Sequence, residues 1–123
     1  RRDLQAEAKS KRWPWDTGKY FDQSAPIGPI TPRTVGEARS FGDELHPKTM
    51  VLTVNGTIRQ SAKLETMIWK VPEIISELSK SFRLKPGDLI MTGTPSGVGP
   101  VVAGDRLVGT IDGLVEPVDI VLV

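Results

Sequence analysis

A helix with one apolar face is predicted in the second half of the chain. Apolar residues recur there at the i, i+3, i+4, i+7 and i+11 positions of one helical face: Val71, Ile74, Ile75, Leu78 and Phe82. Pro72 suits the first turn of this helix, and residues 84–87 end it. We expect the apolar face to pack in a core rather than to form a groove for a partner.

The N-terminal stretch favours a second helix, over residues 2–11. Its leucine and alanines are good helix formers, and Glu7 lies four residues before Lys11, where the two charges attract each other. Pro14 cannot continue a helical hydrogen-bond ladder, and Gly18 favours a turn. We therefore expect this helix to be followed by a loop.

Two antiparallel strand pairs are predicted. The runs with strand character are 50–54, 57–60, 106–111 and 118–123. Asn55-Gly56 is the strongest two-residue hairpin signal, because both turn residues must reach positive φ. Asp112-Gly113 marks the second turn, and Pro117 keeps part of the last strand off a central ladder. Hairpins combined with segregated helices define an α+β fold.

Two segments show neither a helical nor a strand period. Residues 25–32 contain too many prolines for a central strand, so we expect an irregular extended segment. Residues 33–49 combine glycines, a proline and charges, as solvated loops do. The only histidine, His46, lies there beside Pro47. We interpret it as a surface residue, which leaves little support for a Ser-His-Asp triad or a multi-histidine metal site.

Residues 88–100 combine a short apolar run with a glycine-rich loop. The run at 89–91 lies between Pro86-Gly87 and Gly93, which predicts a buried strand that ends in a tight loop. Glycines at 93, 97 and 99 allow positive φ, and the loop offers hydroxyls and free N–H groups suited to an anionic ligand. The alternative is that the glycines and prolines only shape a turn. Their spacing matches neither a Gly-Lys-Ser/Thr phosphate loop nor a dinucleotide fingerprint.

Composition narrows the classes of function. The 123 residues are 38% hydrophobic and 25% charged, as in one globular domain or a piece of one. The net charge is +1 without a basic cluster, which argues against a nucleic-acid surface. The absence of cysteine excludes disulfides and thiolate chemistry, and no apolar run approaches the roughly 20 residues of a membrane helix. We expect a soluble, cytoplasmic protein that acts on small molecules.

Several stretches, taken together and in order, resemble the C-terminal half of the fumarylacetoacetate hydrolase family. They are Arg2-Asp3-Leu4-Gln5, the run from Pro14 to Asp22 with Ser24-Ala25-Pro26, Val54-Asn55-Gly56 with Arg59-Gln60, Thr66-Met67-Ile68, Leu84-Lys85-Pro86-Gly87-Asp88, and the run from Thr92 to Pro100. The resemblance covers nearly the whole chain. Residues 14–26 are most similar to the acylpyruvate and fumarylpyruvate hydrolases.

This resemblance implies a mixed β-sheet roll with a β-hairpin and one or two packed helices, usually in a homodimer. It also implies an enzyme that uses Mg²⁺ or Mn²⁺ to cleave or rearrange 2-oxo and 1,3-diketo carboxylates. In the acylpyruvate branch, water attacks the carbonyl farther from the carboxylate, and the carbon–carbon bond breaks to leave an enolate. A hard divalent cation suits this chemistry, because it binds oxygen ligands and neutralises the enolate charge.

By the same resemblance, Lys19 matches the family's active-site lysine, while Arg2, Gln5 and Thr94 match residues that bind the substrate. These residue types suit the chemistry. A lysine beside aromatic residues can stabilise an oxyanion or move a proton, and hydroxyl and amide donors can orient a carboxylate. Without the resemblance, Lys19 and Gln5 would be interpreted as solvated surface residues.

The resemblance also predicts what the chain lacks. The family's metal is held by a Glu-x-Glu pair and a later Asp, and that Asp falls five residues before the position of Asp3, upstream of Arg1. The acidic residues from 65 to 105 do not reproduce this pattern, so no metal ligand is assigned. We therefore expect residues 1–123 to be the substrate-side, C-terminal part of a catalytic domain whose metal-binding part is missing.

Three functions stay open at this point. The first is metal-dependent hydrolysis of an acylpyruvate such as fumarylpyruvate. The second keeps the family but makes the reaction a decarboxylation or isomerisation of a related 2-oxo diacid. The third is a non-catalytic fragment that keeps the fold for binding or oligomerisation.

Overall fold

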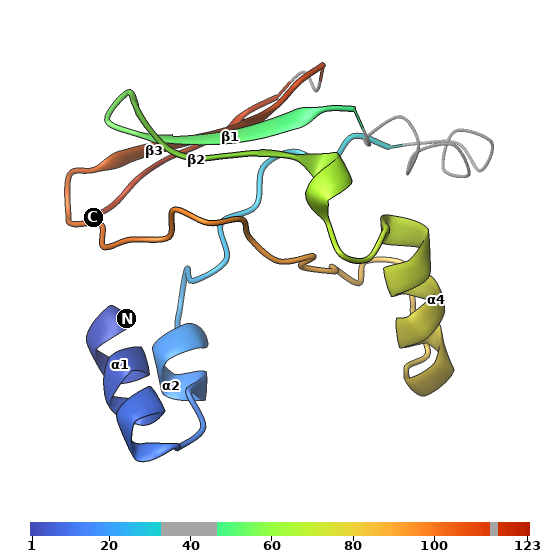
Figure 1. The fold of residues 1–123 in the computed structure, drawn as a ribbon, viewed down its shortest axis with the longest axis horizontal. Coiled ribbons are helices and arrows are strands. Elements are labelled where there is room, and N and C mark those ends of the chain that lie inside the picture. Colours follow the sequence, from blue (N-terminus) through green and yellow to red (C-terminus); the bar gives the residue numbers. More distant parts are fainter. Residues whose placement is uncertain (33–46, 114–115) are drawn as a thin grey trace.

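The computed structural model describes residues 1–32, 47–113 and 116–123 (Figure 1). Its elements are α1 Arg2–Lys11, α2 Asp16–Lys19, β1 Thr49–Val54, β2 Thr57–Lys63, the 3₁₀ turn η1 Leu64–Thr66, α4 Val71–Ser81, β3 Arg106–Ile111 and β4 Val118–Val121. The predicted loop at 33–49, with His46, lies mostly outside the described residues. The predicted α+β class is confirmed.

The strands form one antiparallel sheet in the order β2-β1-β3-β4. The predicted turn between β1 and β2 is confirmed, because Asn55 and Gly56 have φ values of 51° and 79°. The Asn55 side chain also joins this turn to β3: its Nδ2 donates to Asp105 Oδ1 at 2.8 Å, and its Oδ1 accepts from the Arg106 N–H at 2.9 Å. The hairpin turn thus holds the sheet together at one end.

The Asp105 carboxylate also stabilises this end of the sheet through hydrogen bonds. Its pKa lies below the usual value, because the Val102 N–H and the Asn55 amide both donate to the ionised form. A lowered pKa means that this carboxylate stabilises the fold above its unfolded pKa, and that the contribution is lost as the pH falls through its folded pKa.

The N-terminal helix begins and ends as predicted, at Arg2 and Lys11. Arg12 closes it in the left-handed conformation at φ 57°. The predicted loop is present at residues 13–15, but its continuation to Gly18 was wrong, because residues 16–19 form one helical turn, α2. Asp16 in the first position and Lys19 in the last complement the helix dipole, which favours the turn despite Gly18.

The helix α4 is confirmed, but its apolar face is not a core. Glu73 Oε2 accepts from the Lys70 N–H at 2.7 Å and caps the first turn. None of the residues of α4 is buried, and Ile75 and Phe82 are 43% and 63% exposed. Val71, Ile74 and Leu78 are half-buried, but no other described helix or strand packs extensively against α4, so the face predicted to be internal is only partly covered.

The predicted buried strand at 89–91 is also absent. This segment has no strand hydrogen bonding among the described residues, and Leu89 and Met91 are 53% and 67% exposed. The apolar pattern alone could not supply the neighbouring strand edge that such a run needs.

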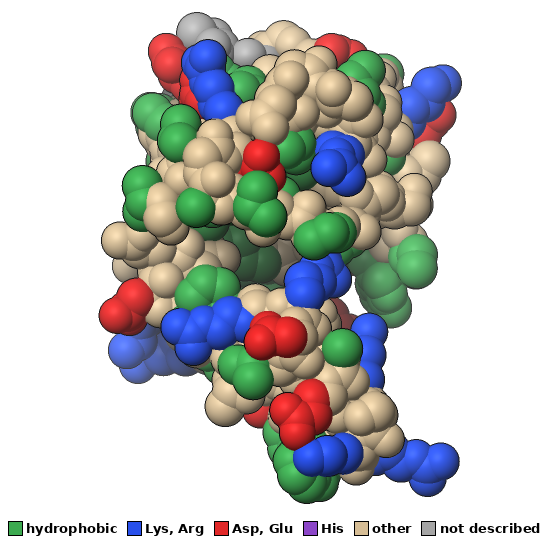
Figure 2. All heavy atoms as spheres, turned by 90° about the vertical axis from the view of Figure 1, so that its left-hand side faces the viewer, with side chains coloured by type: hydrophobic (Ala, Val, Ile, Leu, Met, Phe, Trp, Pro, Cys, Tyr) green, Lys and Arg blue, Asp and Glu red, His purple; other side chains and the backbone are tan. Residues whose placement is uncertain are grey.

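Much of the apolar surface is not enclosed. The chain exposes 9716 Å², whereas a folded monomer of 13.4 kDa exposes roughly 6,500 Å². Among the described residues, only Ala8, Val54 and Gln60 are buried apart from glycine. Figure 2 shows hydrophobic side chains spread over one face of the molecule. Within residues 1–32, 47–113 and 116–123, no helix is long and apolar enough to span a bilayer.

Candidate functional site

The first part of the candidate site is built by the packing of α2 against the start of α1. The main-chain nitrogen of Arg1 donates a hydrogen bond to the Gly18 carbonyl oxygen at 3.1 Å. Gly18 is buried, and a Cβ atom placed there would lie 3.1 Å from the Gln5 nitrogen and 3.3 Å from the Gln5 Cα. The absence of a side chain at residue 18 therefore permits this approach. The contact sets Lys19, the next residue, close to the turn of α1 that carries Gln5.

Arg2 and Gln5 lie on the same face of α1, three residues apart. The Arg2 Nη1 donates to Gln5 Oε1 at 3.5 Å, and Gln5 is half-buried while Arg2 and Lys19 are exposed. Tyr20, the aromatic residue next to Lys19, is 79% exposed. The helix pair thus presents a guanidinium, an amide and an ammonium group, which suit a ligand with anionic oxygens.

The second part of the candidate site is the glycine-rich loop, which carries Thr94. The Thr94 hydroxyl oxygen accepts a hydrogen bond from Gln60 Nε2 at 2.8 Å. The same nitrogen donates to the Pro95 carbonyl, also at 2.8 Å. Gln60 belongs to β2 and is only 7% exposed. A buried amide on the sheet therefore holds the loop at Thr94 and Pro95.

A glycine at residue 97 makes this docking possible. Gly93 and Gly97 have the predicted positive φ, at 106° and 100°. A Cβ at residue 97 would lie 2.0 Å from the Arg59 carbonyl oxygen, a distance that no side chain can accept. Gly99 does not use this freedom, because it is not among the glycines with positive φ. The loop backbone therefore rests directly on β2 at Gly97.

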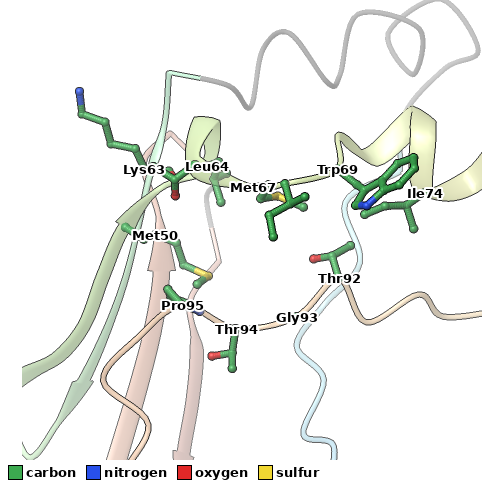
Figure 3. A pocket seen from close by; sticks show the side chains of 13 residues that line it. Met50, Lys63, Leu64, Met67, Trp69, Ile74, Thr92, Gly93, Thr94 and Pro95 are labelled. Carbon is green, nitrogen blue, oxygen red and sulfur yellow. The ribbon is translucent and has the colours of Figure 1, made fainter.

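A cavity of about 430 Å³ lies beside the loop, between it and the segment from β2 to α4. Figure 3 shows Thr92, Gly93 and Thr94 on the loop side of this cavity, with Met67 and Ile74 across from them. Most of the lining side chains are apolar: Met50, Ala62, Leu64, Met67, Ile68, Trp69, Ile74 and Pro95. Thr94 thus borders a mainly apolar cavity of the size of a small ligand, with its side chain directed away from Met67 and Ile74.

The structure gathers the four predicted site residues into two groups. Arg2, Gln5 and Lys19 share the helix pair, and Thr94 lies on the loop. Figure 1 shows the loop segment passing on the same side of the sheet as α1 and α2. No hydrogen bond joins the two groups among the described residues.

Sequence reasoning missed Gln60 as a site residue. It appeared only as one letter of a matching stretch. The signal that could have found it is a polar side chain in a strand at a position that faces inward, because a buried amide requires hydrogen-bond partners nearby.

The described residues do not fit the metal that the family resemblance implies. They contain no group of three or more His, Asp or Glu side chains that could hold a metal ion. Residues 1–32 and 47–113 offer hydroxyl, amide and cationic donors, with Arg2 and Lys19 as the charged ones among the predicted site residues.

Comparison with known proteins defines the class. The family described as fumarylacetoacetate (FAA) hydrolase C-terminal matches residues 1–121. The chain belongs to the fumarylacetoacetate hydrolase family, as the sequence resemblance predicted.

Two curated relatives illustrate the activities found in this family. The chain is 44% identical to a fumarylpyruvate hydrolase of Ralstonia sp over 94% of its own length and 57% of the relative's. It is 42% identical to a mitochondrial oxaloacetate tautomerase of Mus musculus, over 94% of its length and 49% of that protein. The chain thus spans about half the length of these relatives. Both of them are enzymes.

A solved structure shows the same fold. The fumarylpyruvate hydrolase of Pseudomonas aeruginosa, in complex with Mn²⁺ and pyruvate, matches with a TM-score of 0.81 and 44% identity. The match covers 99% of this chain and 49% of that one. Divalent metal binding therefore occurs in a close structural neighbour.

Proposed function

We propose that the protein hydrolyses a carbon–carbon bond of an acylpyruvate, a 2,4-dioxo acid such as fumarylpyruvate. The observation that carries the proposal is the 44% identity to fumarylpyruvate hydrolases, one of them in complex with Mn²⁺ and pyruvate. An acylpyruvate contains the pyruvate skeleton, so a site for pyruvate is half of a site for this substrate. The donors gathered on α1, α2 and the glycine-rich loop support this assignment.

In this proposal each group of residues has a separate task. The Thr94 hydroxyl donates to the substrate carboxylate, and the cavity beside the loop receives apolar parts of the substrate. Arg2 and Gln5 orient the oxo-acid oxygens. The Lys19 ammonium stabilises the negative charge that develops on oxygen as water adds to the distant carbonyl.

We propose further that Mg²⁺ or Mn²⁺ is required, and that its carboxylate ligands come from protein outside the described residues. Two observations support this: the described residues lack a metal cluster, and the chain covers 49% of the neighbour crystallised with Mn²⁺. The part of the protein that supplies these ligands would also cover the exposed apolar side chains between residues 68 and 91. We propose that the enzyme acts as a cytoplasmic homodimer. When bound, the cation supplies charge neutralisation for the enolate product.

A second candidate function is tautomerisation of oxaloacetate. The 42% identity to the Mus musculus oxaloacetate tautomerase favours it. Oxaloacetate is also a 2-oxo acid, so the same carboxylate contacts would serve both reactions. The decarboxylase and non-catalytic alternatives have no comparable observation in their favour.

Product analysis of the full-length protein tests the proposal. With Mn²⁺ present, fumarylpyruvate is expected to yield equimolar pyruvate and fumarate, with a kcat/KM at least tenfold above that for interconversion of enol and keto oxaloacetate. If oxaloacetate tautomerises fast while fumarylpyruvate stays intact, the second function replaces the first. If neither compound reacts, both fail.

A further inference from the structure

We propose that Gln60 is a positioning residue that fixes the direction of the Thr94 hydroxyl hydrogen. By donating to Thr94 Oγ1, Gln60 forces the hydroxyl to act as an acceptor toward β2 and leaves its hydrogen to point away from the sheet, toward the ligand. The inference rests on the proposed function, because it takes Thr94 as the donor to the substrate carboxylate.

The orientation of the Gln60 amide follows from its second partner. An amide group could in principle be turned by 180°, which exchanges its nitrogen and oxygen. The Pro95 carbonyl excludes that alternative, because a carbonyl only accepts and lies 2.8 Å from the Gln60 nitrogen. With the amide turned, two oxygens without a proton would face each other. The nitrogen must therefore face the loop.

The amide orientation in turn determines the role of Thr94. An amide nitrogen donates and does not accept, so the 2.8 Å contact to Thr94 Oγ1 uses a lone pair of the hydroxyl. The hydroxyl hydrogen is then directed elsewhere. Among the described residues it has no internal acceptor, and Thr94 is exposed. The group is thus a preorientated donor for an external anion.

The surroundings of Gln60 keep this arrangement rigid. Gln60 is only 7% exposed, and its amide nitrogen donates to both Thr94 and Pro95. The contact between Gly97 and the Arg59 carbonyl prevents the loop from moving closer to β2. A buried hydrogen bond between groups fixed in this way costs no reordering when the ligand binds.

The test compares two substitutions of similar shape in the full-length protein with Mn²⁺, with pyruvate affinity measured by titration calorimetry. Gln60→Met and Gln60→Glu both lose the hydrogen bonds from the amide nitrogen. Only Gln60→Glu supplies an acceptor that captures the Thr94 hydrogen. We expect Gln60→Glu to weaken pyruvate binding by about tenfold to a hundredfold, and Gln60→Met by less than tenfold.

A Thr94→Val background separates hydroxyl capture from simple charge repulsion. Without the hydroxyl, the difference between Gln60→Glu and Gln60→Met is expected to shrink to less than about threefold, since the two sites act as a unit. Ser61→Glu places the same charge one residue away, on an exposed position of β2, and is expected to leave the affinity unchanged. Melting temperatures confirm that each variant is folded.

Three outcomes overturn the inference. If folded Gln60→Glu and Gln60→Met bind pyruvate equally well, the hydroxyl direction does not matter. If their difference persists in Thr94→Val, repulsion rather than hydroxyl capture explains it. If the unmodified protein does not bind pyruvate but cleaves fumarylpyruvate, this inference fails and the proposed function survives; if it does neither, both fail.

Discussion

Replacing Lys19 by alanine is expected to lower kcat for the acylpyruvate substrate by about 10² to 10³, the effect of removing one oxyanion donor. The ammonium group contributes mainly when negative charge develops on oxygen, so KM should change little. Metal affinity should also stay close to normal, because a charged lysine cannot ligate a cation. Steady-state kinetics and a Mn²⁺ titration on the same variant measure all three quantities.

Lys9→Ala is the matched control for this prediction. Lys9 is another exposed lysine of the same helix pair, and its ammonium lies 5.4 Å from the centre of the Trp15 ring. We expect this variant to keep the kcat of the unmodified protein within about twofold, since a surface substitution of this kind changes little. A Lys19→Ala enzyme with normal turnover would return Lys19 to the solvated surface residues.

Gly97→Ala is expected to displace the glycine-rich loop from β2. The added Cβ would lie 2.0 Å from the Arg59 carbonyl oxygen, and alanine at φ 100° is strained by about 1–2 kcal/mol even without that overlap. The loop must move, which breaks the hydrogen bonds that Gln60 donates to Thr94 and Pro95. We expect pyruvate affinity to fall at least tenfold and Tm to fall by roughly 10 °C.

Gly104→Ala isolates the overlap from the backbone strain. Gly104 has a similar φ of 91°, but a Cβ there meets no atom within 4 Å. The control should therefore lose some stability and keep the pyruvate affinity of the unmodified protein. Equal losses of affinity in the two variants would mean that the contact between Gly97 and Arg59 does not position Thr94.

The elements that the sequence predicted correctly depend on local chemistry. Asn55 and Gly56 both tolerate the positive φ that a two-residue hairpin turn requires, and the turn they predict joins β1 to β2. The helix α4 follows from its apolar spacing and the proline in its first turn, all within a few residues. These signals do not need the rest of the protein.

The failures depend on tertiary partners. Apolar residues at 89–91 predicted a buried strand, but a strand requires a neighbouring strand, and none of the four described strands pairs with this segment. The apolar spacing of α4 likewise predicted a face inside the core. No other described helix or strand packs extensively against that face. Apolar spacing tells which side chains need cover but does not identify what covers them.

The candidate site also has a part that the sequence predicted and a part that depends on tertiary contacts. Its residue types followed from the family resemblance, which placed Arg2, Gln5, Lys19 and Thr94. The contact between Gly18 and Gln5 and the bonds from Gln60 to the loop did not, because they join residues 13 and 34 positions apart. Contacts over such separations come from the fold and could not be derived from spacing along the chain.

A crystal structure of the full-length protein with Mn²⁺ and pyruvate tests the central claim most directly, namely that the helix pair and the glycine-rich loop form one 2-oxo acid site. We expect the pyruvate carboxylate to lie about 2.5–3.0 Å from Thr94 Oγ1, with Gln60 Nε2 still donating to that oxygen and with the Lys19 ammonium directed toward the same cavity. Pyruvate bound away from Thr94, or a Lys19 side chain directed away from the bound ligand, would contradict this account.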